Sequence, residues 1–184
     1  MDTFPTSYLI AGFAALALVV VAVLYLRWRR SPEGRLRRTF NAISEDALID
    51  VVIPDGMGGE IELDRVLLNS KGLLVVDLKE VHGAVFGSEQ MQRWTVIDGN
   101  HRNTFDNPLP ALRDRVAAVR RIASDVPVSG WVVFGDEGEF PKGQPDGVIR
   151  LSELQERYPH DQASRALDAF RAQWDRLRES TRPI

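Results

Sequence analysis

Residues 60 to 79, EIELDRVLLNSKGLLVVDLK, carry the clearest structural pattern in this chain. Two runs rich in apolar residues, 60–68 and 73–79, are each typical of a β-strand. The residues between them, Asn69-Ser70-Lys71-Gly72, have the composition of a turn. The segment therefore predicts an antiparallel hairpin in which Leu68 faces Leu73.

The register of this hairpin brings charged residues opposite one another. Once the first pair is set, the alternation of side chains fixes the others. The expected pairs are Val66 with Val75, Asp64 with Asp77, and Glu62 with Lys79. Directly opposed side chains have Cβ atoms roughly 4.5–5.5 Å apart, and two carboxylates at that separation repel each other. Such a pair needs a compensating cation.

A divalent metal ion suits two such carboxylates, because Mg²⁺ binds one or two of them together with waters and phosphate oxygens. We therefore predict Asp64 and Asp77 as ligands of Mg²⁺, or of Mn²⁺ in its place. Lys79 is the predicted neighbouring charge that stabilises the reaction centre or orients a nucleophile. The alternative is a solvent-exposed face of mixed charge, with Glu62 and Lys79 as an ordinary cross-strand pair. Apolar residues on both faces of 73–78 favour a buried strand, in which an unpaired aspartate is costly.

The periodicity of the remaining chain predicts an α/β sandwich, with a helix, an antiparallel meander, a second helix and a further strand. Asn107-Pro108 is typical of a helix start, with Asn as N-cap and Pro at the first position. Trp94 is expected in the core rather than as a platform for stacking bases. The predicted helices are 31–43, 108–123, 152–157 and 161–179, and the additional strands are 47–53, 83–86, 94–97, 100–104, 128–134 and 148–149, with a turn at Asp98-Gly99.

The N-terminal segment YLIAGFAALALVVVAVLYL, residues 8–26, contains no charge. Its length matches the roughly 20 apolar residues that a helix needs to cross a bilayer. Arg27-Trp28-Arg29-Arg30 follows, and arginines beside a span mark its cytoplasmic side. We therefore predict a single-pass transmembrane helix in the cell (inner) membrane, with the N-terminus outside and the domain in the cytoplasm. The alternative is a cleaved signal peptide, but its basic start and small-residue cleavage site are absent.

The predicted organisation is an anchor with a basic flank at 1–30, an α/β domain at 31–158 and a C-terminal helix at 159–184. Six arginines lie between residues 27 and 38 and suit either anionic lipid or nucleic-acid phosphates. Lipid is favoured because the cluster adjoins the span. The formal net charge of −3 excludes a polycation that wraps nucleic acid, and the absence of cysteine excludes Cys-ligated zinc and thiol catalysis.

Several residues occur in an order that resembles the nuclease-related (NERD) domain family. The matching positions, over about Glu33 to Leu154, are Asp64, the run Gly72 to Lys79, Gly83, Gly87, Trp94 and Asn107-Pro108-Leu109. The resemblance implies a restriction-endonuclease-like α/β sandwich with a mixed sheet, and an N-terminal anchor is common in the family. It also implies a metal site of the form D…[D/E]-x-K, to which Asp64, Asp77 and Lys79 correspond.

The chain departs from the family pattern at several positions. Asp77 replaces the common glutamate, Ala111 stands where a glutamine often follows the Asn-Pro pair, and Arg65 stands where histidine is frequent. The glycine-glutamate order of the first helix is reversed as Glu33-Gly34. Two functions therefore stay open. The first is a Mg²⁺-dependent nuclease that cuts DNA or RNA, and the second is a non-catalytic, membrane-tethered module of the same fold that binds a protein or nucleic-acid partner.

Overall fold

The computed structural model describes residues 16, 19–20, 31–159 and 165–184. The chain divides into two compact units, residues 1–38 and 39–184. Within the described ranges, no helix is both long and apolar enough to cross a membrane. Apart from Leu16, Val19 and Val20, the predicted span at 8–26 lies outside these ranges. The start of the predicted helix 161–179 also lies outside them.

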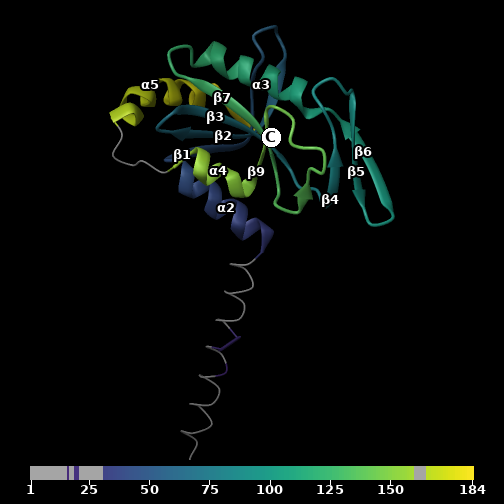
Figure 1. Ribbon diagram of the computed structural model, residues 1–184. Coiled ribbons are helices and arrows are strands. Elements are labelled where there is room, and N and C mark those ends of the chain that lie inside the picture. The colour runs from purple at the N-terminus through teal and green to yellow at the C-terminus, as the bar shows by residue number, and fades with distance from the viewer. Residues whose placement is uncertain (1–15, 17–18, 21–30, 160–164) are drawn as a thin grey trace, which may run out of the picture. The chain divides into compact units, whose positions relative to one another are not determined.

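In the described residues, one helix precedes a run of strands, a second helix and further strands follow, and two helices and a short strand end the chain (Figure 1). The helices are α2 (Pro32–Ile43), α3 (Pro108–Ile122), α4 (Leu151–Arg157) and α5 (Arg165–Glu179). The strands are β1 (Asp46–Pro54), β2 (Glu60–Asn69), β3 (Gly72–Lys79), β4 (Gly83–Phe86), β5 (Arg93–Asp98), β6 (His101–Asp106), β7 (Val128–Phe134), β8 (Gly138–Glu139), β9 (Val148–Arg150) and β10 (Arg182–Pro183).

The larger sheet has the strand order β10-β1-β2-β3-β7-β9. Its first four strands are antiparallel to one another, whereas β3, β7 and β9 run parallel, so the sheet is mixed as predicted. The smaller sheet has the order β6-β5-β4-β8. Helices α3 and α5 cover one face of the larger sheet and α4 covers the other (Figure 1). The prediction of an α/β fold with a mixed sheet is thus confirmed.

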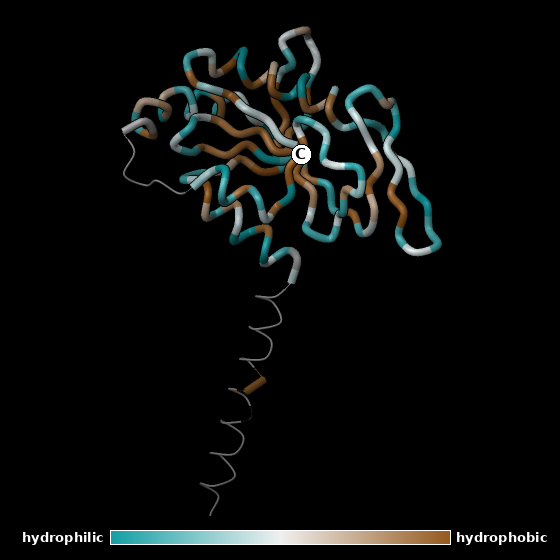
Figure 2. The backbone as a smooth tube through the Cα atoms, viewed as in Figure 1, coloured by the Kyte–Doolittle hydropathy of each residue, from teal (hydrophilic) through white to brown (hydrophobic). Residues whose placement is uncertain are grey.

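Strand β3 lies at the centre of the larger sheet and is apolar along most of its length (Figure 2). It pairs with β2 in the predicted register, with Leu68 facing Leu73 and Val66 facing Val75. Asn69 also faces Gly72, so the loop is reduced to the two residues between them. The register is set by this turn and by apolar side chains that must be buried on both faces.

The turn of the β5–β6 hairpin differs from the prediction. Asp98 faces His101, so the loop is Gly99-Asn100 rather than Asp98-Gly99. Gly99 has φ of +54° at the first loop position, where a type II′ turn favours glycine. The glycine therefore marks the start of the loop and not its end.

Trp94 is fully buried and confirms the expectation of a core residue. Its ring stacks on Phe134 with centroids 6.2 Å apart and meets the ring of Phe105 edge-on at 6.0 Å. Gly87 lies directly beneath the indole, since a Cβ atom at this glycine would be 2.1 Å from the ring atom Cδ2 of Trp94. Gly87 and Trp94 thus form one packing unit.

We expect Gly87→Ala to lower the free energy of unfolding by about 1–3 kcal/mol, the usual cost of forcing extra volume into a packed core. Denaturant unfolding of the purified chain measures the change. Gly135→Ala is the matched control, because no atom lies within 4 Å of a Cβ atom there. Equal stability of the two variants would contradict the close packing of Gly87 on Trp94.

Candidate active site

The β2–β3 ladder ends at the pair Arg65 and Val76. Asp64 and Asp77 are therefore not ladder partners, and neither are Glu62 and Lys79, so the predicted pairing is wrong at this end of the hairpin. The carboxylate of Asp64 instead accepts a hydrogen bond from the backbone N–H of Leu78, at 3.1 Å. This contact gives the Asp64 carboxylate a backbone donor at the point where the β2–β3 ladder has ended.

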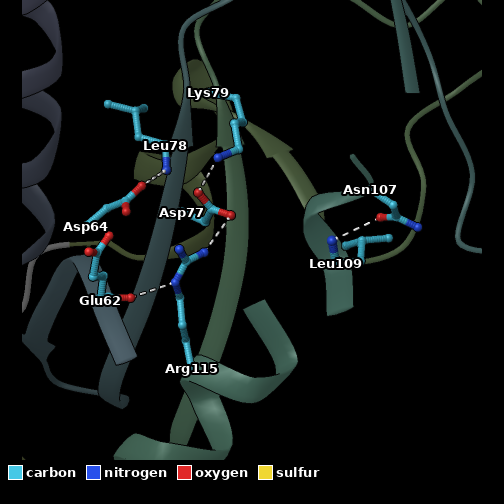
Figure 3. A network of polar contacts seen from close by, with 8 residues as sticks. All are labelled: Glu62, Asp64, Asp77, Leu78, Lys79, Asn107, Leu109 and Arg115. Atoms are coloured by element: carbon cyan, nitrogen blue, oxygen red, sulfur yellow. Dashed lines mark hydrogen bonds and ion pairs between the residues drawn. The ribbon is translucent and has the colours of Figure 1, made fainter. Parts of the chain in front are cut away.

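Asp77 remains buried at the point where the ladder opens, with a side chain that is 1% exposed. Its oxygen Oδ1 accepts from the ammonium Nζ of Lys79 at 2.7 Å, and Oδ2 accepts from Nη1 of Arg115 at 3.0 Å (Figure 3). Asp77 and Lys79 are therefore in contact, as predicted. Both carboxylate oxygens already have a positively charged partner.

Arg115 projects from α3 and joins the two separated strands (Figure 3). Besides binding Asp77 on β3, its Nε donates to the backbone carbonyl of Glu62 on β2, at 2.8 Å. The arginine side chain is only 18% exposed. It thus holds the open end of the hairpin together from the helix above.

Burial is the largest influence on the carboxyl group of Asp77 and raises its pKa above the ordinary value of 3.8. The hydrogen bond and the positive charge of Lys79 act in the opposite direction, and so does the charge of Arg115. The negative charge of Asp64 raises the pKa further, so Asp64 lies close enough for the two carboxylates to repel each other. The structure thus brings Asp64, Asp77 and Lys79 into one electrostatic group.

A cleft of about 480 Å³ opens beside this group. Its wall includes Asp77, Lys79, Phe105, Asn107, Ala111 and Arg115. Asn107 caps α3 as predicted, because its Oδ1 accepts from the backbone N–H of Leu109 at 3.0 Å. Its amide also donates to the carbonyls of Ser88, Glu89 and Met91, which fixes the loop before β5 against the start of the helix.

The model of the nuclease-related (NERD) domain family matches residues 34–135, which is more than half of the chain. The chain belongs to the NERD family. No curated protein and no solved structure matched it. The matched range contains every residue of the group around Asp77, including Arg115, as well as the packing unit of Gly87 and Trp94.

The donors of this NERD domain suit Mg²⁺ in type, because that ion needs only one or two carboxylates beside waters and phosphate oxygens. Within the ranges that the structure describes, no three Asp, Glu, His or Cys residues gather into a metal-binding group. The carboxylate of Asp77 is already bonded to the positive charges of Lys79 and Arg115. A metal ion on Asp77 therefore has to share or replace one of these cationic partners.

Sequence reasoning missed Arg115, although its position carried a signal. Arg115 lies three residues after Leu112 and four before Val119, both of which are buried on the inner face of α3. An arginine at this helical spacing points along the same face as its apolar neighbours. A buried arginine requires an acidic partner, so this NERD domain needed a carboxylate opposite α3.

The raised pKa of Asp77 predicts a pH-dependent stability of this NERD domain. A carboxyl group with a raised pKa in the folded state stabilises the fold below its unfolded pKa, and this contribution is lost as the pH rises through the folded pKa. We therefore expect Asp77→Asn to melt above the parent at neutral pH in chelator, with a difference that shrinks as the pH falls toward 3.8. Thermal melts across this range test the trend.

The matched control for this series is Asp114→Asn, which changes the net charge equally at an exposed position on α3. The parent, Asp77→Asn and the control are compared in the same buffers. A constant difference between Asp77→Asn and the parent at every pH would show that burial does not govern the ionisation of Asp77.

Proposed function

We propose that this NERD domain is a nuclease that hydrolyses phosphodiester bonds in DNA or RNA, with Asp64, Asp77 and Lys79 as its active residues and Mg²⁺ as its cofactor. The observation that carries the proposal is the buried carboxylate of Asp77, bound to Lys79 at 2.7 Å, on the wall of a 480 Å³ cleft. In a cleft that contains both groups, the carboxylate can bind a cation and the ammonium group can neutralise negative charge on a phosphate.

The roles of the residues follow from their exposure and partners. Asp64 and Asp77 supply oxygens to the cation, and Mn²⁺ is the expected substitute. When bound, Mg²⁺ lowers the pKa of water and neutralises charge on a phosphate. Lys79 is 32% exposed, so its ammonium reaches from Asp77 into the cleft, where it donates to a phosphate oxygen as negative charge develops.

The restriction-endonuclease-like arrangement that the family resemblance implies is part of the same proposal. Strand β3 ends in Asp77-Leu78-Lys79, and it runs parallel to β7 at the centre of the mixed sheet. Alternation along the strand then directs Asp77 and Lys79 to one face, the face that α3 covers. The two residues of the D-x-K pair are thus brought together by the pleat of a single strand.

A second candidate function is a non-catalytic module that binds a protein or nucleic-acid partner. The favouring observation is that Asp77 accepts from Lys79 and from Arg115, which leaves both of its oxygens paired in the absence of any metal. A domain that kept this arrangement in all conditions would use the four charges only for stability. Cleavage assays separate the two functions.

We expect the parent chain to cleave single- or double-stranded DNA or RNA in Mg²⁺ or Mn²⁺ and to be inactive in chelator. Lys79→Met should lower the cleavage rate roughly a hundredfold, as loss of one charge-stabilising donor usually does. Asp77→Asn should abolish cleavage while the protein stays folded. Lys142→Met, an exposed lysine outside the cleft, is the matched control and should retain the parent rate. Absence of cleavage by the parent on all substrates would favour the binding module.

For the N-terminal segment we propose a membrane anchor at residues 8–26, with lipid contacts through the arginines that follow and the NERD domain in the cytoplasm. The proposal rests on the uncharged run and its arginine flank. The chain has no cysteine of its own, so a single introduced cysteine reports its location. Cysteine at position 3 should react with a membrane-impermeant maleimide on intact cells, and cysteine at position 142 should react only after lysis. The opposite pattern would reverse the orientation.

A further inference from the structure

Arg115 is the residue of the Asp77 group that the family pattern does not account for. Its guanidinium bonds to Oδ2 of Asp77 at 3.0 Å and to the carbonyl of Glu62 at 2.8 Å. The neighbouring Arg113 on the same helix is 63% exposed and pairs with Glu89 instead. Of these two arginines, only Arg115 is directed into the sheet, where it meets a carboxylate that is 1% exposed.

The position of Arg115 conflicts with a metal ion on the same carboxylate. A buried charge must be paired, and Arg115 and Lys79 both bond to the carboxylate of Asp77. A divalent cation on the same carboxylate would place two further positive charges beside the guanidinium, next to an aspartate that is 1% exposed. Repulsion between the guanidinium and the cation then opposes their binding to one carboxylate together.

We propose that Arg115 is an internal competitor of the metal ion: it holds Asp77 in the metal-free domain and has to release Oδ2 before a divalent cation binds there. The inference rests on the proposed function and names the residue that controls metal occupancy at that site. Arg115 is a positioning residue in this scheme, because it acts on Asp77 and not on the substrate bond.

The geometry favours Arg115 over Lys79 as the cation that moves. Lys79 lies two residues from Asp77 on the same strand, and its ammonium stays beside the carboxylate at 2.7 Å. Arg115 comes from α3 and has a second anchor, the carbonyl of Glu62, which it can keep while Nη1 leaves Asp77. Arg115 also lines the cleft of about 480 Å³, so a released guanidinium has a space to enter. A phosphate in that cleft would attract it away from Asp77.

The test compares Mn²⁺ binding by the full chain in detergent micelles, measured from the paramagnetic resonance signal of free Mn²⁺. Arg115→Gln should bind Mn²⁺ about tenfold more tightly than the parent. The parent has to break the charge-assisted hydrogen bond between Arg115 and Asp77 first, and the cost of breaking one such bond corresponds to about this factor. Arg113→Gln changes the net charge equally on the same helix and should bind like the parent. In chelator, Arg115→Gln should melt below the parent, and Mn²⁺ should restore its melting temperature.

The outcomes separate this inference from the proposed function. If Arg115→Gln binds Mn²⁺ no more tightly than the parent and Asp77→Asn does not bind it, Arg115 does not compete with the metal ion. The proposed metal site would then be retained. No Mn²⁺ binding by the parent or by Arg115→Gln would overturn both. If Arg115→Gln does not fold, Arg115→Lys replaces it, since a lysine keeps a charge near Asp77 without a fork that also reaches Glu62. It should also bind Mn²⁺ more tightly than the parent, and equal affinity overturns the competition.

Discussion

The buried carboxylate of Asp77 is the constraint to which the surrounding structure responds. A negative charge that is 1% exposed requires partners of opposite charge, and it receives them from two elements: Lys79 from its own strand and Arg115 from α3. Arg115 in turn bonds to Glu62, so the strand that would otherwise separate from β3 is retained. One buried charge therefore links β3, β2 and α3 beside the cleft.

The approach of α3 to the sheet depends on small residues at the contact. A Cβ atom at Gly130 of β7 would lie 2.4 Å from a methyl group of Val116, so the glycine lets the helix pack closely on the strand. Asn107 fixes the first turn of the same helix through its cap and through three carbonyls of the preceding loop. Together these contacts place Arg115 within reach of Asp77. Thus the Asn-Pro marker of the NERD family positions a helix, whereas its D-x-K pair supplies the charges.

The sequence predicted the part of the site that depends on local pattern. The turn at Asn69 to Gly72 and the apolar runs on either side of it were enough to set the register as far as Val66 and Val75. The prediction failed two residues later, because a side chain competed with the ladder: the carboxylate of Asp64 took the N–H of Leu78. A hydrogen bond from a side chain to a strand N–H leaves no trace in the apolar pattern of the sequence.

Arg115, the second cationic partner of Asp77, was also beyond the reach of local pattern, for a different reason. The spacing of Leu112 and Val119 shows which face of α3 is buried, but it does not show which strand residue lies beneath each side chain. That information comes from the close contact of α3 with β7 and from the parallel pairing of β3 with β7. The sequence indicated that the carboxylates needed a cation, and a metal ion was the natural interpretation of two opposed aspartates. The structure shows that the chain supplies cations of its own.

A metal ion and an internal arginine are two solutions to the same electrostatic problem, and a nuclease can require both. In the absence of metal, an unpaired Asp77 would be costly to bury, and Lys79 alone would have to offset both carboxylates. An arginine on a helix removes this cost without permanently occupying the metal position that we propose, because its long side chain can leave while its backbone stays packed. A lysine on the same strand cannot separate from Asp77 as far. In our proposal, the division of roles between Lys79 and Arg115 follows from where each is attached: the strand keeps its cation beside the carboxylate, and the helix holds one that can be exchanged.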